Sequence, residues 1–169
     1  MRLDPLTPDQ RTGLGWIYFN AGRYEDSLRV LAERHPASAW GKVPRTYEAW
    51  NHALAGRYQE AIDILEGESA ESSGLLHRAS LGWALARAGR RAEAEEILSD
   101  LEARVGEGAD PYLAAVVAAG LDDAARAMRW LERAHEQHSP NMIHVKIEPF
   151  FGPLRRLRAY DRLVERMKL

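Results

Sequence analysis

The chain of 169 residues is 46% hydrophobic and 28% charged, a balance typical of a folded domain and not of a disordered segment. Its formal net charge of −2 provides no overall attraction for nucleic acid or acidic lipid. Cysteine is absent, which excludes disulfides, thiol chemistry and cysteine metal ligands.

The opening segment MRLDPLTPDQ lacks the apolar stretch of a signal peptide. No apolar run approaches the roughly 20 residues that a membrane-spanning helix needs. We therefore expect a cytoplasmic protein that makes no membrane contact.

Three similar phrases follow one another along the chain. AGRYEDSLRVL begins at Ala21, AGRYQEAIDIL at Ala55 and AGRRAEAEEIL at Ala88. Their glycines are 34 and then 33 residues apart. Periods of about 20–50 residues indicate stacked repeat units, and a period of about 34 is typical of a two-helix unit.

Helix start and stop signals occur in pairs along the chain. Thr7-Pro8, Asp110-Pro111 and Ser139-Pro140 each place an N-cap residue before a proline that suits the first helical position. The repeat glycines follow apolar-periodic segments, where a left-handed residue can end a helix. We expect helix pairs at 8–20 with 24–34, 44–55 with 58–67, 74–87 with 91–104, and 111–119 with 122–137. A short helix at 140–147, a proline-containing turn at 148–153 and a last helix at 156–168 follow, with repeat connections at 36–43 and 66–74.

Alignment of the repeats on their turn residues (Gly22, Gly56, Gly89 and Asp122) brings small side chains into register. Seven positions before the turn stand Gly15, Ala49, Gly82 and Ala115; five after it stand Ser27, Ala61, Ala94 and Ala127; nine after it stand Leu31, Leu65, Leu98 and Leu131. Helix axes approach to about 8 Å only where side chains are small. We expect the two small columns where paired helices touch, and the leucines in the seam to the next repeat.

These residues resemble the tetratricopeptide repeat family. The fit is good in the first repeat at Leu14-Gly15, Tyr18, Gly22, Tyr24 and Leu31, and in the third at Leu81-Gly82, Gly89, Ala94, Leu98 and Leu101. In the second repeat Glu48 replaces the leucine, and the fourth repeat is degenerate in its first helix. The resemblance implies an all-α, right-handed α–α superhelix as a single domain over 1–169. Its repeats would lie at about 8–36, 43–68, 74–105 and 110–137, with a C-terminal cap at about 139–169.

Residues 110–169 resemble the closing segment of tetratricopeptide regions in large bacterial signalling proteins, such as winged-helix regulators, serine/threonine kinases and nucleotide cyclases. Two departures are Tyr160 in place of phenylalanine and Leu157-Arg158-Ala159 in place of Asp-Pro-Arg. Leu3-Asp4-Pro5 resembles the end of a preceding repeat, which suggests a piece of a longer protein; a short leader that merely resembles such an end is the alternative.

The resemblance implies a concave face built from the first helix of each repeat. Trp16, Trp50 and Trp83 occupy one column, six positions before the turn residue, and form an aromatic stripe at the repeat spacing. We predict a partner-binding groove lined by Thr12, Trp16, Phe19, Asn20, Thr46, Trp50, Leu54, Ala79, Trp83 and Arg87. The alternative is that the tryptophans pack internally, on adjacent repeats or beneath the C-terminal segment.

The predicted function is a non-catalytic protein–protein interaction module that binds a protein or peptide segment in this groove. The alternative is a sensory or regulatory domain that binds a small molecule or a short peptide for a signalling protein. We expect no cofactor, no metal site and no enzyme: His135-Glu136-Gln137-His138 lacks the spacing of a zinc-protease motif, because Ser139 stands where the second histidine would be.

The C-terminal residues 141–169 carry seven basic and three acidic side chains. Nucleic-acid binding through Arg155, Arg156, Arg158 and Arg162 is the less favoured use of this charge, since no groove-reading motif accompanies it. The cap is expected to cover the last repeat with Phe150, Phe151, Leu154, Tyr160 and Leu163. The opposite end, around Leu14 and Tyr18, has no visible cap, which leaves self-association through that end open.

Overall fold

A computed structural model describes residues 8–32, 45–67 and 74–167, except for the side chains of residues 8–12. The predicted N-cap Thr7 and the predicted connection at 36–43 lie outside these residues. The chain packs as two compact units, Met1–Gly67 and Glu68–Leu169, and each is treated by itself below. The described segments are helical and contain no strand, as the sequence predicts.

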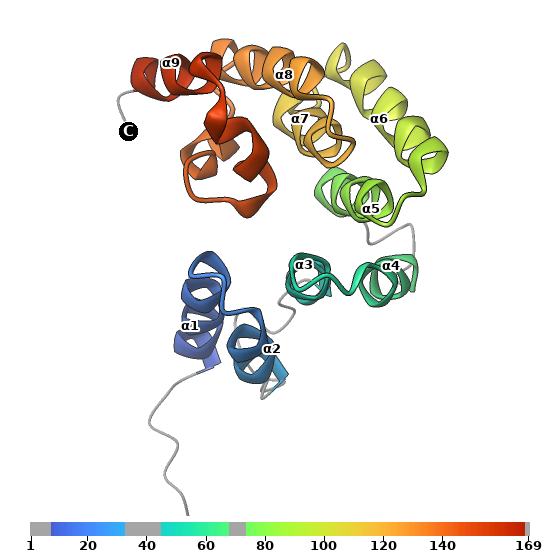
Figure 1. Cartoon of the computed structure of the whole chain (residues 1–169), viewed down its shortest axis with the longest axis vertical. Helices are drawn as coiled ribbons and strands as arrows, with labels where there is room; N and C mark the ends of the chain where they lie inside the picture. The colour runs from blue at the N-terminus through green and yellow to red at the C-terminus, as the bar shows by residue number, and fades with distance from the viewer. Residues whose placement is uncertain (1–7, 33–44, 68–73, 168–169) are drawn as a thin grey trace, which may run out of the picture. The chain divides into compact units, whose positions relative to one another are not determined.

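The described residues of the first unit form two helix pairs (Figure 1). Helices α1 (Pro8–Asn20) and α2 (Tyr24–Ala32) form the first pair, and α3 (Arg45–Leu54) and α4 (Tyr58–Glu66) form the second. Each pair packs together, and α2 also packs against α3.

The second unit continues with α5 (Leu75–Arg87), α6 (Arg91–Val105), α7 (Pro111–Gly120) and α8 (Ala124–Glu136). Helix α7 is buried along its whole length because α5, α6, α8 and the C-terminal segment pack around it. Within each unit, consecutive helix pairs pack in the manner of an all-α, tetratricopeptide-like solenoid. No helix within the described parts of the chain has the length and apolar character needed to cross a membrane.

The turn between the helices of each pair has the predicted conformation. Gly22, Gly56 and Gly89 have φ values of +72°, +84° and +82°, a region that side chains disfavour. Asp122 takes the same place in the fourth pair with φ of +58°. The following N–H reaches back to close each helix, for example from Arg23 to the carbonyl of Tyr18 at 2.9 Å.

The aligned small residues lie where the helices touch. Gly15, Ala49, Gly82 and Ala115 are buried, as are Ser27, Ala61, Ala94 and Ala127. A Cβ added to Gly82 would lie 2.8 Å from Ile97 Cγ2 and 3.0 Å from Val117 Cγ2, distances that leave no room for a methyl group. The close approach of α5, α6 and α7 therefore requires glycine at this position.

The N-caps predicted in the second unit are present. The side chain of Asp110 accepts a hydrogen bond from the N–H of Tyr112 at 2.9 Å, and that of Ser139 accepts one from the N–H of Asn141 at 3.2 Å. Each cap is followed by proline at the first helical position.

The C-terminal segment differs in detail from its prediction. Residues Pro140–His144 form a 3-10 helix (η1), and the expected turn at 148–153 is a second 3-10 helix, η2 (Pro149–Arg156). Prolines at positions 149 and 153 lack the N–H groups that a longer α-helix would use. The last helix, α9, spans Arg158–Arg166, and no side chain caps its N-terminus, in line with the missing proline motif.

The five residues predicted to form the cap are all buried: Phe150, Phe151, Leu154, Tyr160 and Leu163 are at most 4% exposed. They belong to η2 and α9, and η2 packs on α7 and α8. The segment therefore covers the last helix pair.

Candidate functional site

The ten predicted groove residues differ widely in exposure. The buried ones are Phe19, Thr46, Trp50, Ala79 and Trp83. The half-buried ones are Trp16, Asn20 and Leu54, and Arg87 is exposed. Thr12 belongs to α1, but its side chain lies outside the described part of the structure.

Among the described residues of the first unit, five rings form one group, the α1–α3 aromatic cluster: Trp16, Phe19, Tyr24, Tyr47 and Trp50. Trp16 stacks on Phe19 with ring centroids 5.4 Å apart and an interplanar angle of 18°. It also meets Tyr47 edge-on at 5.5 Å. Trp50 lies 5.9 Å from Phe19 and 4.9 Å from Tyr47. Trp16 and Trp50, two of the three tryptophans predicted to line the groove, thus share one cluster. Trp16 is the more exposed of the two.

Two asparagines extend from the same helices. The Nδ2 of Asn20 donates to the carbonyl of Trp16 at 2.9 Å, and the Nδ2 of Asn51 donates to the carbonyl of Tyr47 at 2.8 Å. Both Oδ1 atoms are buried and have no hydrogen-bond donor. A buried acceptor without a donor costs about 1–3 kcal/mol, and because the fold encloses both oxygens, a binding partner cannot supply the donor.

In the second unit, Trp83 lies on α5 beneath the C-terminal segment. Its ring meets Phe150 of η2 edge-on with centroids 5.0 Å apart. A Cβ added to Gly120 of α7 would lie 2.8 Å from Trp83 Cδ1, so the indole rests directly on the backbone of α7. These contacts explain why Trp83 is only 6% exposed.

Arg87, the exposed predicted groove residue, extends from the end of α5. Its Nη1 lies 3.1 Å from Oδ1 and 3.2 Å from Oδ2 of Asp122. The side chain of Asp122 is 69% exposed and that of Arg87 is 35% exposed, and pairs at the surface contribute only about 0–1 kcal/mol. Arg87 is therefore free to exchange this contact for another anion at little cost.

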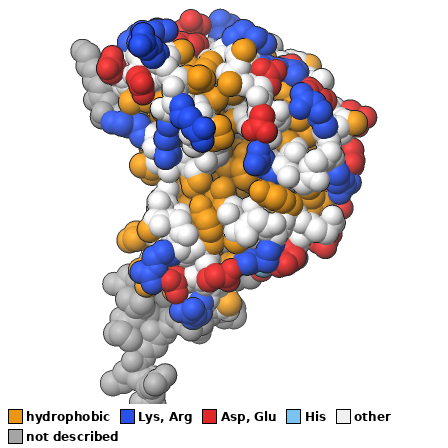
Figure 2. All heavy atoms as spheres, viewed as in Figure 1, with side chains coloured by type: hydrophobic (Ala, Val, Ile, Leu, Met, Phe, Trp, Pro, Cys, Tyr) orange, Lys and Arg blue, Asp and Glu red, His pale blue; other side chains and the backbone are white. Residues whose placement is uncertain are grey.

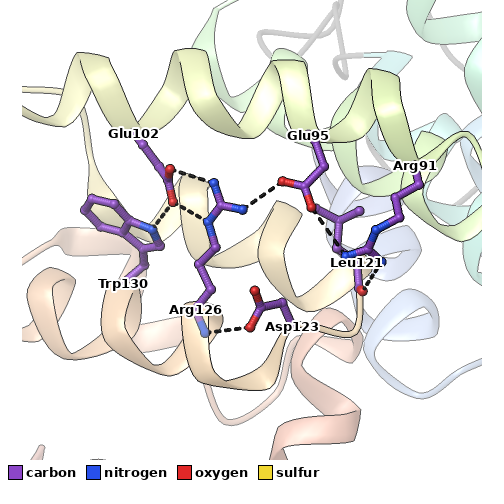
Figure 3. Close-up of polar contacts among 7 residues, drawn as sticks. All are labelled: Arg91, Glu95, Glu102, Leu121, Asp123, Arg126 and Trp130. Atoms are coloured by element: carbon purple, nitrogen blue, oxygen red, sulfur yellow. Dashed lines mark hydrogen bonds and ion pairs between the residues drawn. The ribbon is translucent and has the colours of Figure 1, made fainter.

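A polar network, the α6–α8 network, joins two helices of neighbouring pairs (Figure 3). The guanidinium of Arg126 donates twice to Glu102, with Nε–Oε1 and Nη2–Oε2 distances of 2.7 Å, and once to Glu95 Oε2, also at 2.7 Å. Trp130 Nε1 donates to Glu102 Oε1 at 2.6 Å. These hydrogen bonds, led by those from Arg126, hold the pKa of Glu102 below its usual value.

Glu95 joins the same network from α6. Glu95 is half-buried and binds Arg126 of the next helix pair. The main-chain N–H of Arg126 also donates to Asp123 Oδ1 at 2.9 Å, which caps α8 (Figure 3). The charges of Arg126, Glu95 and Glu102 are paired with one another between α6 and α8. This pairing favours a structural role for the network.

Charges of both signs are mixed over the surface. Figure 2 shows Lys and Arg side chains interspersed with Asp and Glu over the viewed face. Arg166 on α9 pairs with Glu132 on α8, and Arg155 Nη2 donates to the main-chain oxygen of Glu148 at 3.0 Å. Two of the C-terminal arginines thus bind neighbouring parts of the same fold. Within the described segments, no group of three or more His, Asp or Glu side chains is arranged to hold a metal ion.

Several residues of these surfaces were not predicted. Tyr24 and Tyr47 complete the α1–α3 aromatic cluster, and the spacing of Tyr47 to Trp50 on one helix was the available signal. Packing of a tryptophan beneath the C-terminal segment was one of the two interpretations, but the sequence did not pair Phe150 with Trp83, because the C-terminal segment does not follow the repeat pattern.

Part of the second unit matches a known protein family. Residues 75–99, which span α5 and the first part of α6, match the model of the tetratricopeptide repeat family. Neither the curated proteins nor the solved structures yield a match to the chain. The family match and the consecutive helix pairs together support a tetratricopeptide repeat architecture.

Proposed function

We propose that the chain is a non-catalytic module that binds a segment of a protein partner, and that the surface around Trp16 is the contact. Tetratricopeptide repeats generally mediate protein–protein interactions and are typically non-catalytic. The observation that carries the proposal is the half-buried indole of Trp16, which two neighbouring rings hold in place.

A rigid, partly exposed tryptophan suits binding for two reasons. Its large apolar surface gains free energy when a partner covers it, and tryptophan is enriched among residues that dominate interface affinity. Because Phe19 and Tyr47 already fix the ring, little side-chain entropy is lost on binding.

Asn20 follows Trp16 by one helical turn, and its side chain serves the helix itself. Its Nδ2 donates to the main-chain oxygen of Trp16, and its Oδ1 is buried, so a partner does not reach that atom. We therefore infer a peptide segment whose apolar side chain covers the ring of Trp16.

The test begins with capture of the partner and mapping of the bound segment, which is then titrated as a synthetic peptide. Trp16→Ala should weaken binding by about 30-fold or more, as expected for a dominant interface residue. Ile17→Ala is the matched control, since Ile17 is the next residue on α1, is 63% exposed and points in another direction around the helix. Both variants must keep their helical circular dichroism.

Equal affinity of the Trp16→Ala variant and the wild-type chain would overturn the assignment of the surface. Capture of a small molecule that binds without any peptide would instead support the sensory alternative. Loss of binding in both variants would show that the effect is not specific to the indole.

A further inference from the structure

A carboxyl group is buried where the C-terminal segment joins α7. Glu148 immediately precedes η2 and is only 6% exposed. The hydroxyl of Tyr112 on α7 donates to Glu148 Oε2 in a short hydrogen bond. The ring of Tyr112 also meets Phe151 of η2 edge-on, with centroids 5.3 Å apart. Glu148 is thus the polar part of an otherwise apolar attachment.

The charged and titratable groups around this carboxyl come from four elements. They are Tyr112 on α7 and Asp110, the N-cap of that helix; the Asp110 carboxylate accepts hydrogen bonds from Ser139 Oγ and Asn141 Nδ2, both at 2.7 Å. On α9, the hydroxyl of Tyr160 donates to the carbonyl of Val145 at 2.6 Å, and it does not bind the carboxyl.

The nearby cation does not neutralise Glu148. Arg155 of η2 donates to the main-chain oxygen of Glu148 at 3.0 Å, and this hydrogen bond does not involve the carboxyl group. His144 of η1 accepts the N–H of Glu148 through its own main-chain oxygen at 2.9 Å. No ion pair joins the Glu148 carboxyl to a Lys, Arg or His side chain in the part of the chain that the structure describes.

A buried carboxylate without a cation is costly, and the proton is retained instead. Burial raises the pKa of Glu148 to about 7, although the hydrogen bond from Tyr112 acts in the opposite direction. The protonated, neutral carboxyl of Glu148 can accept the hydrogen bond from the Tyr112 hydroxyl and remain in the apolar site.

We propose that Glu148 is a pH-dependent latch, whose protonated carboxyl holds residues 149–156 against α7 and whose ionisation loosens that segment. The segment includes Phe150, which covers Trp83 on α5. Loosening it would expose Trp83 and the adjoining backbone at Gly120. Glu148 would therefore control access to the surface around Trp83 on α5. This role does not depend on whether the Trp16 surface binds a partner.

The direction of the pH dependence follows from proton linkage. A glutamate in the released segment has the ordinary value of about 4.5, whereas the docked one titrates near 7. The docked form retains the proton more strongly than the released form does. The resulting stabilisation of the docked segment is complete below pH 4.5 and is lost as the pH rises to about 7. Between about pH 5 and about pH 8 the docking equilibrium should weaken by roughly 70-fold.

The test is hydrogen exchange of the amides of residues 149–163, measured over that pH range and corrected for the intrinsic exchange rate. In the wild-type chain the protection of this segment should fall as the pH rises. Glu148→Gln keeps the shape and the acceptor for Tyr112 but cannot ionise, so its protection should not depend on pH. Asp161→Asn, an exposed acid on α9, is the control and should behave as the wild-type chain does.

Tyr112→Phe supplies a second readout. Its hydroxyl lowers the pKa of Glu148, so its removal should move the titration to higher pH. A Glu148→Gln variant with the same pH dependence as the wild-type chain would overturn the proposal. Should that variant fail to fold, the carboxyl ¹³C resonance of Glu148 in the wild-type chain decides: a midpoint near 7 supports the latch, and one near 4.5 refutes it.

Discussion

Trp83 on α5 and Phe150 on η2 meet edge-on with ring centroids 5.0 Å apart, which brings the C-terminal segment onto a helix of the third repeat. The segment therefore does more than cover the last helix pair: it reaches across α7 to the preceding one. Of the two interpretations of the tryptophan stripe, internal packing beneath the C-terminal segment describes the surroundings of Trp83. Trp16, in the other unit, keeps a partly exposed ring.

Gly120→Ala should destabilise the second unit. The new Cβ would lie 2.8 Å from Trp83 Cδ1 and 3.2 Å from its Cα, and Phe150 restricts movement of the ring from another direction. We expect the free energy of unfolding to fall by about 1–2 kcal/mol, since overpacking outweighs the higher helix propensity of alanine. Urea unfolding of both proteins measures the difference.

The control for this change is Gly152→Ala. Gly152 lies on η2, and a Cβ there would have no atom within 4 Å. Its free energy of unfolding should change by less than about 0.5 kcal/mol. Equal free energies of unfolding for Gly120→Ala and Gly152→Ala would contradict the close contact between α7 and Trp83.

Gly89→Ala isolates the cost of the turn conformation. Gly89 has φ of +82°, and a Cβ there would meet no atom within 4 Å, so only backbone strain is added. We expect a loss of about 1–2 kcal/mol in thermal or urea unfolding. Asp122→Gly is the reciprocal change: it relieves a φ of +58° but removes the exposed pair with Arg87, so stability should be unchanged or slightly higher. Loss of stability in Asp122→Gly with none in Gly89→Ala would contradict this account.

The helix pairs could be predicted because their signals are local. The N-cap and proline at Asp110 and Ser139, and the glycine turns such as Gly89, act within a few residues and set the helix ends. The alignment of the repeats with one another could be predicted from the small residues. A position such as Gly82 has no room for a methyl group, so large side chains are excluded there.

The surroundings of the groove residues could not be predicted from the same signals. The repeat spacing indicates that Trp16, Trp50 and Trp83 occupy equivalent positions, but exposure depends on what covers each one. The cover on Trp83 comes from η2, which has no counterpart in the repeats. Likewise, the charge pattern of α6 did not reveal that Arg126 approaches Glu95 from another helix.

Trp50→Ala and Trp16→Ala should differ in their effect on folding. Trp50 is only 5% exposed and contacts Phe19 and Tyr47, so its truncation should cost about 3–5 kcal/mol. Trp16 is half-buried, and its truncation should cost about half as much. Chemical unfolding followed by circular dichroism measures both; a Trp50→Ala protein as stable as the wild-type chain would show that this ring is not part of the core of the first unit.

The α6–α8 network should be more sensitive to substitution than the isolated surface pairs. Arg126→Ala leaves Glu95 and Glu102 close together without their shared cation, and we expect a loss of about 1–2 kcal/mol. Arg126→Lys should recover only part of it, because an ammonium group cannot reproduce the paired hydrogen bonds to Glu102. Arg133→Ala is the control, since its 3.7 Å pair with Glu136 is exposed and should contribute little.

Acid titration provides an independent check on this network. The pKa of Glu102 is lowered in the folded chain, chiefly by the hydrogen bonds from Arg126, so its contribution to stability is present above the ordinary value of 4.5 and is lost as the pH falls through the lower folded value. The wild-type chain should therefore lose more stability on acidification than Arg126→Ala does. Parallel acid profiles for the two proteins would mean that the network holds α6 to α8 without the charge of Glu102, a result that the twin hydrogen bonds from the guanidinium argue against.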